Sequence, residues 1–244
     1  MKDFFNTITA ALGFLFYMVF SAIMLIPLQI LKLPGFEKQL KSISFFMTSK
    51  WGHFVFWANH SKMIVKGREN LPDHERIIYI ANHQAYADIP LMMAQMPTMI
   101  GFIAKKELGK VPVIGPWMKS IHCILVDRGN FRKAMREIEV GITEAGQGRP
   151  KVIFPEGTRS HSAKMNPFKP GSVLLAAKAG LTIVPVTINN TYKTWEEHNK
   201  IRSAELHLTI HPCIETEGMS EEEQKALTQR LWHIIADALP NKGE

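Results

Sequence analysis

The sequence predicts an α/β fold, in which a mixed, partly parallel sheet is flanked by helices and preceded by a hydrophobic two-helix membrane-anchoring motif. Two observations support this prediction. Downstream of residue 76, short apolar runs of strand length alternate with longer helical patterns, as in sheets that are at least partly parallel. Residues 1–60 are instead hydrophobic and aromatic, so we expect a membrane anchor there and an α/β domain over residues 61–244.

The N-terminal segment from Phe4 to Leu31 contains no charged residue and is longer than the roughly 20 residues that cross a hydrocarbon core. Pro27 and the sequence Leu33-Pro34-Gly35 are expected to interrupt it. A second helical segment, from Phe36 to Asn59, mixes lysines with aromatic residues, which is the composition of a membrane interface. Two arrangements are open, a membrane span or a helical hairpin in one leaflet. A buried core helix is disfavoured, because a chain of this size rarely needs such a long uncharged helix inside.

Six apolar runs predict strands at residues 77–81, 99–104, 121–126, 151–154, 182–188 and 205–211. Helical patterns lie between them, including residues 131–147, where alanine and isoleucine recur on one face. The last helix is the best marked, because Ser220 and Glu223 match a capping box and an apolar stripe follows. Glycine and proline cluster at residues 109–116 and 167–171, which we interpret as loops.

The composition favours anionic partners. A net charge of +7 suits nucleic acid, anionic lipid or phosphorylated substrates. We predict no nucleic-acid partner, because the chain has no arginine-rich tract, zinc-finger spacing or base-stacking motif. Cys123 and Cys213, both expected within strands, form no disulfide framework, which indicates a reducing compartment. The histidines lack the paired spacing of a zinc site, so we predict no metal.

A histidine and a carboxylate follow the apolar run 77–80, in the sequence Asn82-His83-Gln84-Ala85-Tyr86-Ala87-Asp88. Such a pair can act as a general base toward a hydroxyl. On one continuous helix a spacing of five residues would separate the two side chains by roughly 140°. We therefore expect a turn after Asn82 and a helix with Asp88 at its N-cap and Pro90 in its first turn. Alternatively, Asp88 only caps its helix and His83 only satisfies a loop carbonyl.

A second motif, Phe154-Pro155-Glu156-Gly157-Thr158-Arg159-Ser160, follows the apolar run 152–154. A glycine that permits a turn, a hydroxyl, an acid and a guanidinium within four positions suit a loop around an anionic oxygen group. A phosphate ester is the natural candidate. The alternative is a surface turn in which Glu156 and Arg159 pair with each other in water.

Together these segments resemble the glycerolipid acyltransferase family, specifically its bacterial 1-acyl-sn-glycerol-3-phosphate acyltransferases. Residues 83–88 resemble the first motif of the family, 126–128 the core of the second, 154–159 the third and 184–188 the fourth. The resemblance runs in the order of the family from about Arg76 to Asn189. One departure is that family members often carry a glycine several residues before the aspartate of the second motif, where this chain has His122 and Cys123.

The resemblance implies transfer of an acyl group from acyl-CoA or acyl carrier protein to the sn-2 hydroxyl of lysophosphatidic acid, which forms phosphatidic acid. His83 would be the general base and Asp88 would orient it. Direct attack is favoured over a covalent intermediate, because no serine or cysteine nucleophile elbow accompanies His83. No metal or organic cofactor is expected, since a thioester is already activated.

The resemblance further implies that residues of the second and third motifs bind the glycerol phosphate: Arg128, Glu156, Gly157 and Arg159. Lys105 is a further candidate cation at a predicted strand end, and its alternative is a solvated helix start. The alternative for Arg128 is an ion pair with Asp127 or another acid. Thr158 is included in the site, although it can also close the turn through its own backbone.

Two other functions are open. One is an acyltransferase of the same fold that uses glycerol-3-phosphate or a lyso-aminolipid as acceptor, and the other is a non-catalytic peripheral protein that binds anionic lipid. The resemblance favours the hairpin in one leaflet, with membrane lipids as partners. For a span, the excess of lysines after residue 31 would place the α/β acyltransferase domain in the cytoplasm. Together with the resemblance, this predicts the cytoplasmic face of a bacterial inner membrane.

Overall fold

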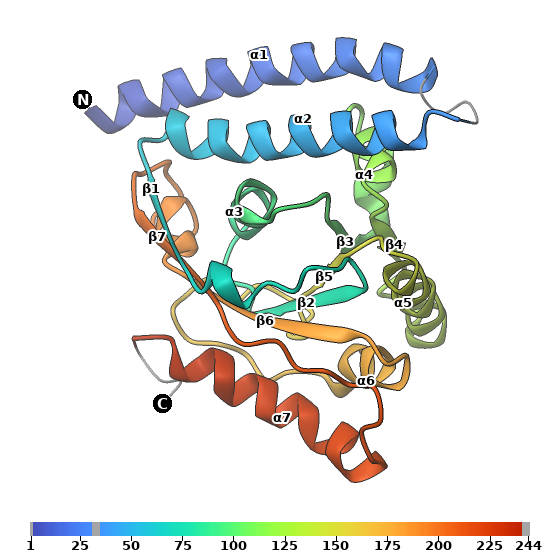
Figure 1. Ribbon diagram of the computed structural model, residues 1–244. Helices are drawn as coiled ribbons and strands as arrows, with labels where there is room; N and C mark the ends of the chain where they lie inside the picture. The colour runs from blue at the N-terminus through green and yellow to red at the C-terminus, as the bar shows by residue number, and fades with distance from the viewer. Residues whose placement is uncertain (1, 31–34, 241–244) are drawn as a thin grey trace.

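The computed structural model describes residues 2–30 and 35–240. A seven-stranded sheet lies between two groups of helices, in the order β1-β7-β6-β2-β5-β3-β4 (Figure 1). The strands are β1 (Lys62–Lys66), β2 (Ile77–Ala81), β3 (Gly101–Lys105), β4 (Ile124–Val126), β5 (Lys151–Ile153), β6 (Thr182–Asn189) and β7 (Glu205–Ile210). The helices are α1 (Lys2–Ile30), α2 (Glu37–Ala58), α3 (Asp88–Gln95), α4 (Ile114–Ser120), α5 (Phe131–Gly146), α6 (Pro170–Lys178) and α7 (Glu221–Asp237). The predicted α/β class and the mixed sheet are confirmed.

Five neighbouring strands, β6, β2, β5, β3 and β4, run parallel, whereas β7 is antiparallel to β6 and carries β1 parallel to itself. The central strands β2 and β6 are buried along their whole length, because helices cover both faces. All five parallel strands therefore end at one edge of the sheet. In parallel α/β sheets, ligands bind at this carboxyl edge.

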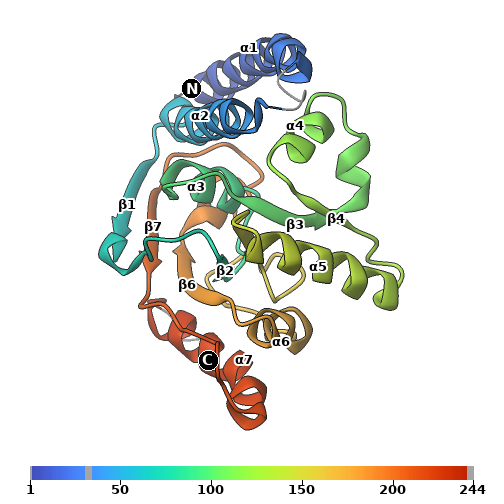
Figure 2. The same ribbon diagram turned by 45° about the vertical axis from the view of Figure 1, so that its right-hand side comes forward.

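Two apolar layers fix the helices on the sheet. On one face, alternate residues of β2, β6 and β7 pack with α2 and α3, and on the other face residues of β2, β5 and β6 pack with α5, α6 and α7. Figure 2 shows the same layers from another direction. The predicted capping box of α7 is confirmed, since Ser220 Oγ accepts from the Glu223 amide while the Glu223 carboxylate accepts from the Ser220 amide.

Several sequence-based boundaries were wrong. β1 was not predicted, and the strand expected at 121–126 begins only at Ile124, because the amide of Cys123 donates to the carbonyl of Met118 in α4. Cys213 likewise lies outside β7. The loop expected at 109–116 contains the start of α4, and the loop at 167–171 contains the start of α6. Proline fits both helix starts, because the first-turn amides of a helix have no partner inside it.

Helices α1 and α2 lie side by side at the top of the molecule in Figure 1. The Tyr17 ring stacks on Phe54 with 5.5 Å between centroids, and its hydroxyl donates to the carbonyl of Met47 at 2.7 Å. Pro27 does not interrupt α1, contrary to the prediction. Residues 31–34 of the predicted break lie outside the described residues. Among the helices that the structure describes, none meets the length and apolarity needed to cross a membrane.

Residues of the sheet and of α2 pack into one core, although they lie on opposite sides of residue 60 in the sequence. The domain boundary expected at residue 60 stays a prediction. Phe56 of α2 is fully buried with residues of β2 and α3. Gly52 allows this approach, because a Cβ there would lie 2.3 Å from the carbonyl oxygen of Pro90. The short distance between α2 and α3 therefore depends on the absence of a side chain at Gly52.

We expect Gly52→Ala to destabilise the fold by about 1–3 kcal/mol, the usual effect of overpacking, because backbone atoms cannot rotate away as a side chain could. Thermal unfolding of detergent-solubilised protein would measure the change. Gly146→Ala is the matched control, since its Cβ would meet only Leu181 Cδ2 at 3.7 Å. Equal unfolding temperatures for Gly52→Ala and the parent would contradict the close packing.

A buried ion pair lies at the opposite, amino edge of the sheet. Lys151 is fully buried, with its Nζ 2.8 Å from Glu144 Oε2 and 3.1 Å from the carbonyl oxygen of Arg149. Burial lowers the pKa of Lys151, although the neighbouring Glu144 opposes this shift. The carboxylate thus compensates a cation that is removed from water.

Glu144→Ala should destabilise the protein by about 3 kcal/mol, because it leaves the Lys151 ammonium buried and unpaired. Glu139→Ala, at an exposed position of the same helix, should change stability by less than about 0.5 kcal/mol. Urea unfolding followed by circular dichroism distinguishes the two. A Glu144→Ala variant as stable as Glu139→Ala would show that Lys151 finds another partner.

Candidate active site

The loops that follow β2, β4, β5 and β6 converge at the carboxyl edge of the sheet. The loop after β5 runs along the loop after β2, since the amides of Ser160 and His161 donate to the carbonyls of His83 and Gln84 at 2.8 and 3.0 Å. Asn82 fastens the start of the β2 loop to β6, because its side chain both accepts from the amide of Ile188 and donates to its carbonyl. The two predicted motifs are therefore adjacent.

His83 and Asp88 form the predicted pair. His83 Nδ1 lies 2.7 Å from Asp88 Oδ2, and the carboxylate also accepts the amides of Gln84 and Ala85 at 2.7 and 3.0 Å. Asp88 is fully buried, whereas the His83 side chain is 15% exposed. With Nδ1 turned toward the carboxylate, Nε2 is the ring nitrogen left to act on a substrate.

Asp88 is not the N-cap of its helix, and in this detail the prediction was wrong. The N-cap is Ala87, and Asp88 is the first residue of α3, with its carboxylate turned back to the preceding loop. The two amides that it accepts belong to that loop and not to the helix. The alternative in which Asp88 only caps the helix is therefore wrong as well.

A third residue, Thr191, completes the support of the aspartate. Its side chain is fully buried, and its hydroxyl donates to Asp88 Oδ1 at 2.5 Å. Sequence reasoning missed Thr191, which lies just beyond the weak fourth motif at 184–188. The only available signal was a threonine shortly after a buried strand that ends at the same edge.

Phe154 and Glu156 hold His83 in place. The imidazole stacks on the Phe154 ring with 4.1 Å between centroids, and the His83 amide donates to Glu156 Oε1 at 2.6 Å. The other oxygen, Oε2, accepts the amide of Asn166 at 2.9 Å. Glu156 is buried, and desolvation raises the pKa of its carboxyl above the usual value. Both oxygens are thus engaged by the protein, so Glu156 orders the loop around His83.

Arg128 and Gly157 join the second and third motifs. Arg128 Nη1 donates to the carbonyl of Gly157 at 2.9 Å, whereas Asp127 pairs with Lys106. The predicted alternative of an Arg128–Asp127 pair is therefore wrong. Gly157 has a φ of 72°, and a Cβ there would lie 3.0 Å from Lys169 Nζ. Lys169 is thus a further cation beside this turn, and no sequence motif marks it.

Arg159 is held on two sides by residues outside its own motif. Its Nη1 lies 3.1 Å from Glu196 Oε1, and its guanidinium lies 3.5 Å from the centre of the Tyr86 ring. The predicted alternative of an Arg159–Glu156 pair is wrong. Glu196 Oε1 also accepts the amide of Tyr86 at 2.8 Å, and its side chain is 4% exposed. Glu196 therefore links the loop after β2 to the loop that carries Arg159.

Two predicted residues have fewer contacts. Lys105 ends β3 with an exposed ammonium 3.8 Å from Glu107, so it faces solvent at the same edge of the sheet. Thr158 lies between Gly157 and Arg159 in the turn after β5. Within residues 2–30 and 35–240, no cluster of three or more histidine, cysteine or acidic side chains is arranged to hold a metal ion.

The arrangement can remove a proton at one point and hold an anionic group next to it. An imidazole backed by a buried carboxylate is able to act as a base, and guanidinium groups are able to offer paired N–H donors to phosphate-like oxygens. Fold and site together define an α/β protein with a histidine–carboxylate pair and a cationic loop at the carboxyl edge of its sheet.

The chain belongs to the acyltransferase family, whose model matches residues 62–189. A relative from Borreliella burgdorferi named 1-acyl-sn-glycerol-3-phosphate acyltransferase is 30% identical over 83% of this chain and 80% of its own length. A coconut enzyme of the same name is 30% identical over 78% of this chain, which spans 61% of that relative. A crystal structure of the 1-acyl-sn-glycerophosphate acyltransferase PlsC from Thermotoga maritima superposes with a TM-score of 0.82, at 27% identity, and covers 96% of this chain and 93% of that one.

Proposed function

We propose that the chain transfers a fatty acyl group from an acyl thioester to the sn-2 hydroxyl of 1-acyl-sn-glycerol 3-phosphate, which forms phosphatidic acid in phospholipid biosynthesis. The observation that carries this proposal is the His83–Asp88 pair, 2.7 Å apart, beside a loop with arginines at its rim. The names of the relatives suggest the acceptor.

In the proposed reaction, His83 Nε2 takes the proton of the acceptor hydroxyl as that oxygen attacks the carbonyl carbon of the thioester. The Asp88 carboxylate stabilises the imidazolium and fixes its orientation. The tetrahedral intermediate expels the thiolate, and the imidazolium returns the proton to the leaving sulfur. The acyl group thus passes directly from sulfur to oxygen, and the enzyme ends in its starting protonation state.

Direct transfer is supported by the state of two other side chains that could act as nucleophiles. Ser160, in the same loop, donates its hydroxyl to the carbonyl of Ser162 at 3.0 Å and so is not paired with the histidine. Burial raises the pKa of the Cys123 thiol to about 12, which leaves almost no thiolate at neutral pH. Neither residue is an activated nucleophile.

The phosphate of the acceptor is proposed to bind the cations at the carboxyl edge: Arg128, Arg159 and Lys105, with Gly157 and Thr158 forming the turn between them. Arg159 uses one nitrogen for Glu196 and one face for Tyr86, so its remaining N–H groups are available to an anion. The turn at Gly157 has no side chain, which lets an anionic group approach the backbone closely.

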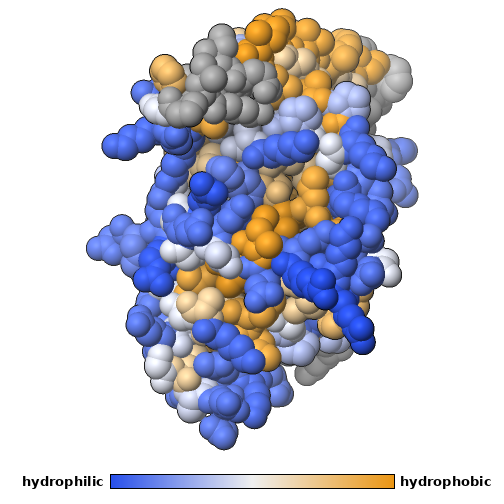
Figure 3. All heavy atoms as spheres, turned by 90° about the vertical axis from the view of Figure 1, so that its right-hand side faces the viewer, coloured by the Kyte–Doolittle hydropathy of each residue, from blue (hydrophilic) through white to orange (hydrophobic). Residues whose placement is uncertain are grey.

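We further propose that α1 and α2 attach the protein to one leaflet of a bacterial plasma membrane from its cytoplasmic side. The outer face of α1 exposes large apolar side chains, among them Leu15, Phe16 and Ile26 at 60, 71 and 68%. Figure 3 shows a hydrophobic region at the top of the molecule, where α1 lies. At the far end of α2, a cleft lined by Lys50, His53 and Trp57 combines an ammonium group with polar and aromatic rings, which suits lipid headgroups.

An acceptor panel tests the reaction. Detergent-solubilised protein would receive a labelled palmitoyl group on CoA or on acyl carrier protein, with lysophosphatidic acid, glycerol-3-phosphate or a lyso-aminolipid as acceptor. We expect phosphatidic acid as the main product. Faster acylation of another acceptor would replace the proposed substrate. A complete lack of product, with retained binding to anionic vesicles, would favour the lipid-binding role.

A further inference from the structure

The surface that follows the second motif has a composition that the proposed reaction does not explain. Phe131, the first residue of α5, is 76% exposed, which is the highest value among the large apolar side chains of the described residues. Arg132, Lys133 and Arg136 surround it on the same first two turns and are also exposed. We call Phe131, Arg132, Lys133 and Arg136 the α5 patch.

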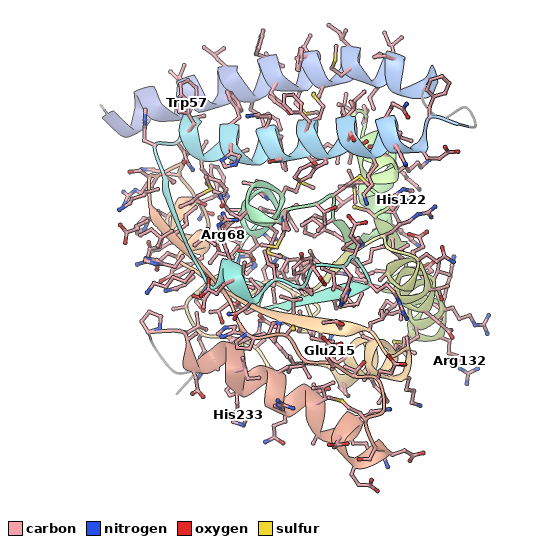
Figure 4. The ribbon with its side chains drawn as sticks, in the orientation of Figure 1. Trp57, Arg68, His122, Arg132, Glu215 and His233 are labelled. Carbon is pink, nitrogen blue, oxygen red and sulfur yellow. The ribbon has the colours of Figure 1, made fainter. Side chains whose placement is uncertain are left out.

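The cations of the α5 patch make few contacts with the rest of the protein. No contact of Arg132 or Arg136 with another described residue reaches hydrogen-bond or ion-pair distance, and Lys133 lies 4.0 Å from Glu137, which also accepts the amide of Asp127. Figure 4 shows Arg132 extending from α5 away from the molecule. The exposed acid on this side of α5 is Glu139, one turn further along the helix. The patch is therefore positive and open to solvent.

The cations of the α5 patch also lie at the end of the helix where positive charge is unfavourable. The amino end of a helix carries partial positive charge, so Arg132 and Lys133 in the first turn are unfavourable for α5 itself. The first turn of α5 contains no acid, whereas the first turn of α7 contains Glu221, Glu222 and Glu223. Residues that are unfavourable for their own helix and make no compensating contact indicate a role in binding rather than in folding.

The position of the patch connects it to the site. Phe131 comes three residues after Arg128, whose guanidinium holds the carbonyl of Gly157 at 2.9 Å in the loop around the base. In Figures 1 and 2, α5 lies at the side of the sheet and away from α1. A partner bound to the α5 patch would thus reach the carboxyl edge while the apolar face of α1 stays in contact with a membrane.

We propose that the α5 patch is the docking surface for a protein that carries the acyl thioester, bound through an acidic helix with apolar side chains beside its acids. This inference rests on the proposed function and specifies its donor. The outermost cations lie roughly 6 Å apart along the helix axis, which matches acids on successive turns of a second helix. The apolar ring among them has no counterpart on the diphosphate of a nucleotide. The exposed ring of Phe131 gives such a contact its apolar centre.

Two donors with the same acyl chain test the proposal. Transfer of palmitate to lysophosphatidic acid would be measured from palmitoyl-acyl carrier protein and from palmitoyl-CoA, with the parent, Arg132→Glu/Arg136→Glu and Phe131→Ser. We expect kcat/KM with the carrier protein to fall by about tenfold or more in both variants, mainly through KM, while kcat/KM with palmitoyl-CoA stays within about twofold. Arg230→Glu, an exposed position on α7, is the matched control and should leave both donors unchanged.

Each contrary outcome is distinct. Equal losses with both donors, a loss with palmitoyl-CoA alone, or no loss at all would overturn the docking surface. Binding of fluorescently labelled palmitoyl-acyl carrier protein, followed by anisotropy, separates this inference from the proposed reaction. A parent that binds the carrier protein through the α5 patch but acylates no acceptor would refute the reaction alone, whereas an active parent whose carrier affinity is unchanged in both variants would refute the docking surface alone.

Discussion

Replacing His83 with alanine is expected to lower acyl transfer to lysophosphatidic acid by about 10²- to 10⁴-fold, the usual contribution of a general base. An unassisted hydroxyl is a poor nucleophile at neutral pH. The 2.7 Å contact with Asp88 orients the His83 imidazole to accept the proton of the hydroxyl. The variant should keep its fold, because the amide of residue 83 still donates to Glu156 and only the side chain is lost. Initial rates of phosphatidic acid formation from labelled acyl donor measure the effect.

The control for this variant is His233→Ala, which removes an exposed imidazole from α7 (Figure 4). It should retain the parental rate. Thermal unfolding of both variants would show that the loss of rate does not arise from loss of fold. Turnover of His83→Ala near the parental level would mean that another group removes the proton.

The part of the site that could be predicted from the sequence is local in the chain. His83 and Asp88 lie five residues apart after one apolar run, so their pairing needs only a turn and not the whole fold. The turn at Gly157 is equally local, because glycine tolerates its φ of 72° and few other residues do. Both motifs directly follow predicted strands, so the sequence also predicts that they lie at one edge of a parallel sheet.

The missed part depends on pairs that are far apart in sequence. Thr191 contacts Asp88 across 103 residues, and Glu196 contacts Tyr86 across 110. A threonine and a glutamate in a polar stretch have no pattern of their own, and only the parallel pairing of β6 with β2 brings them to the site. Strand β1 was missed for a similar reason, since the sequence Lys62–Lys66 is short and half-exposed, and β7 alone pairs with it.

Replacing Arg159 with alanine should lower kcat/KM for lysophosphatidic acid by about 100-fold, mainly through a higher KM. Loss of two hydrogen bonds to a charged group, at about 1.5–3 kcal/mol each, accounts for a change of this size or larger. Arg159→Lys should recover only part of the loss, because an ammonium cannot stack flat on Tyr86 and offer two parallel donors. Arg230→Ala on α7 is the control, and an Arg159→Ala variant with a parental KM would remove this residue from the phosphate site.

A variant of Glu196 tests the same prediction at a residue that acts on Arg159 rather than on the substrate. Glu196→Gln keeps the shape of the side chain and an acceptor for the Tyr86 amide but removes the charge that holds Arg159 at 3.1 Å. We expect it to raise KM by about tenfold in the parent and to add little in the Arg159→Ala background, because residues that act through one contact are not additive. Equal effects in both backgrounds would show that Glu196 acts independently of the guanidinium. A coupled result would mean that the acceptor phosphate is bound by an arginine whose orientation is set by a carboxylate from the loop after β6, which also holds the loop of the base.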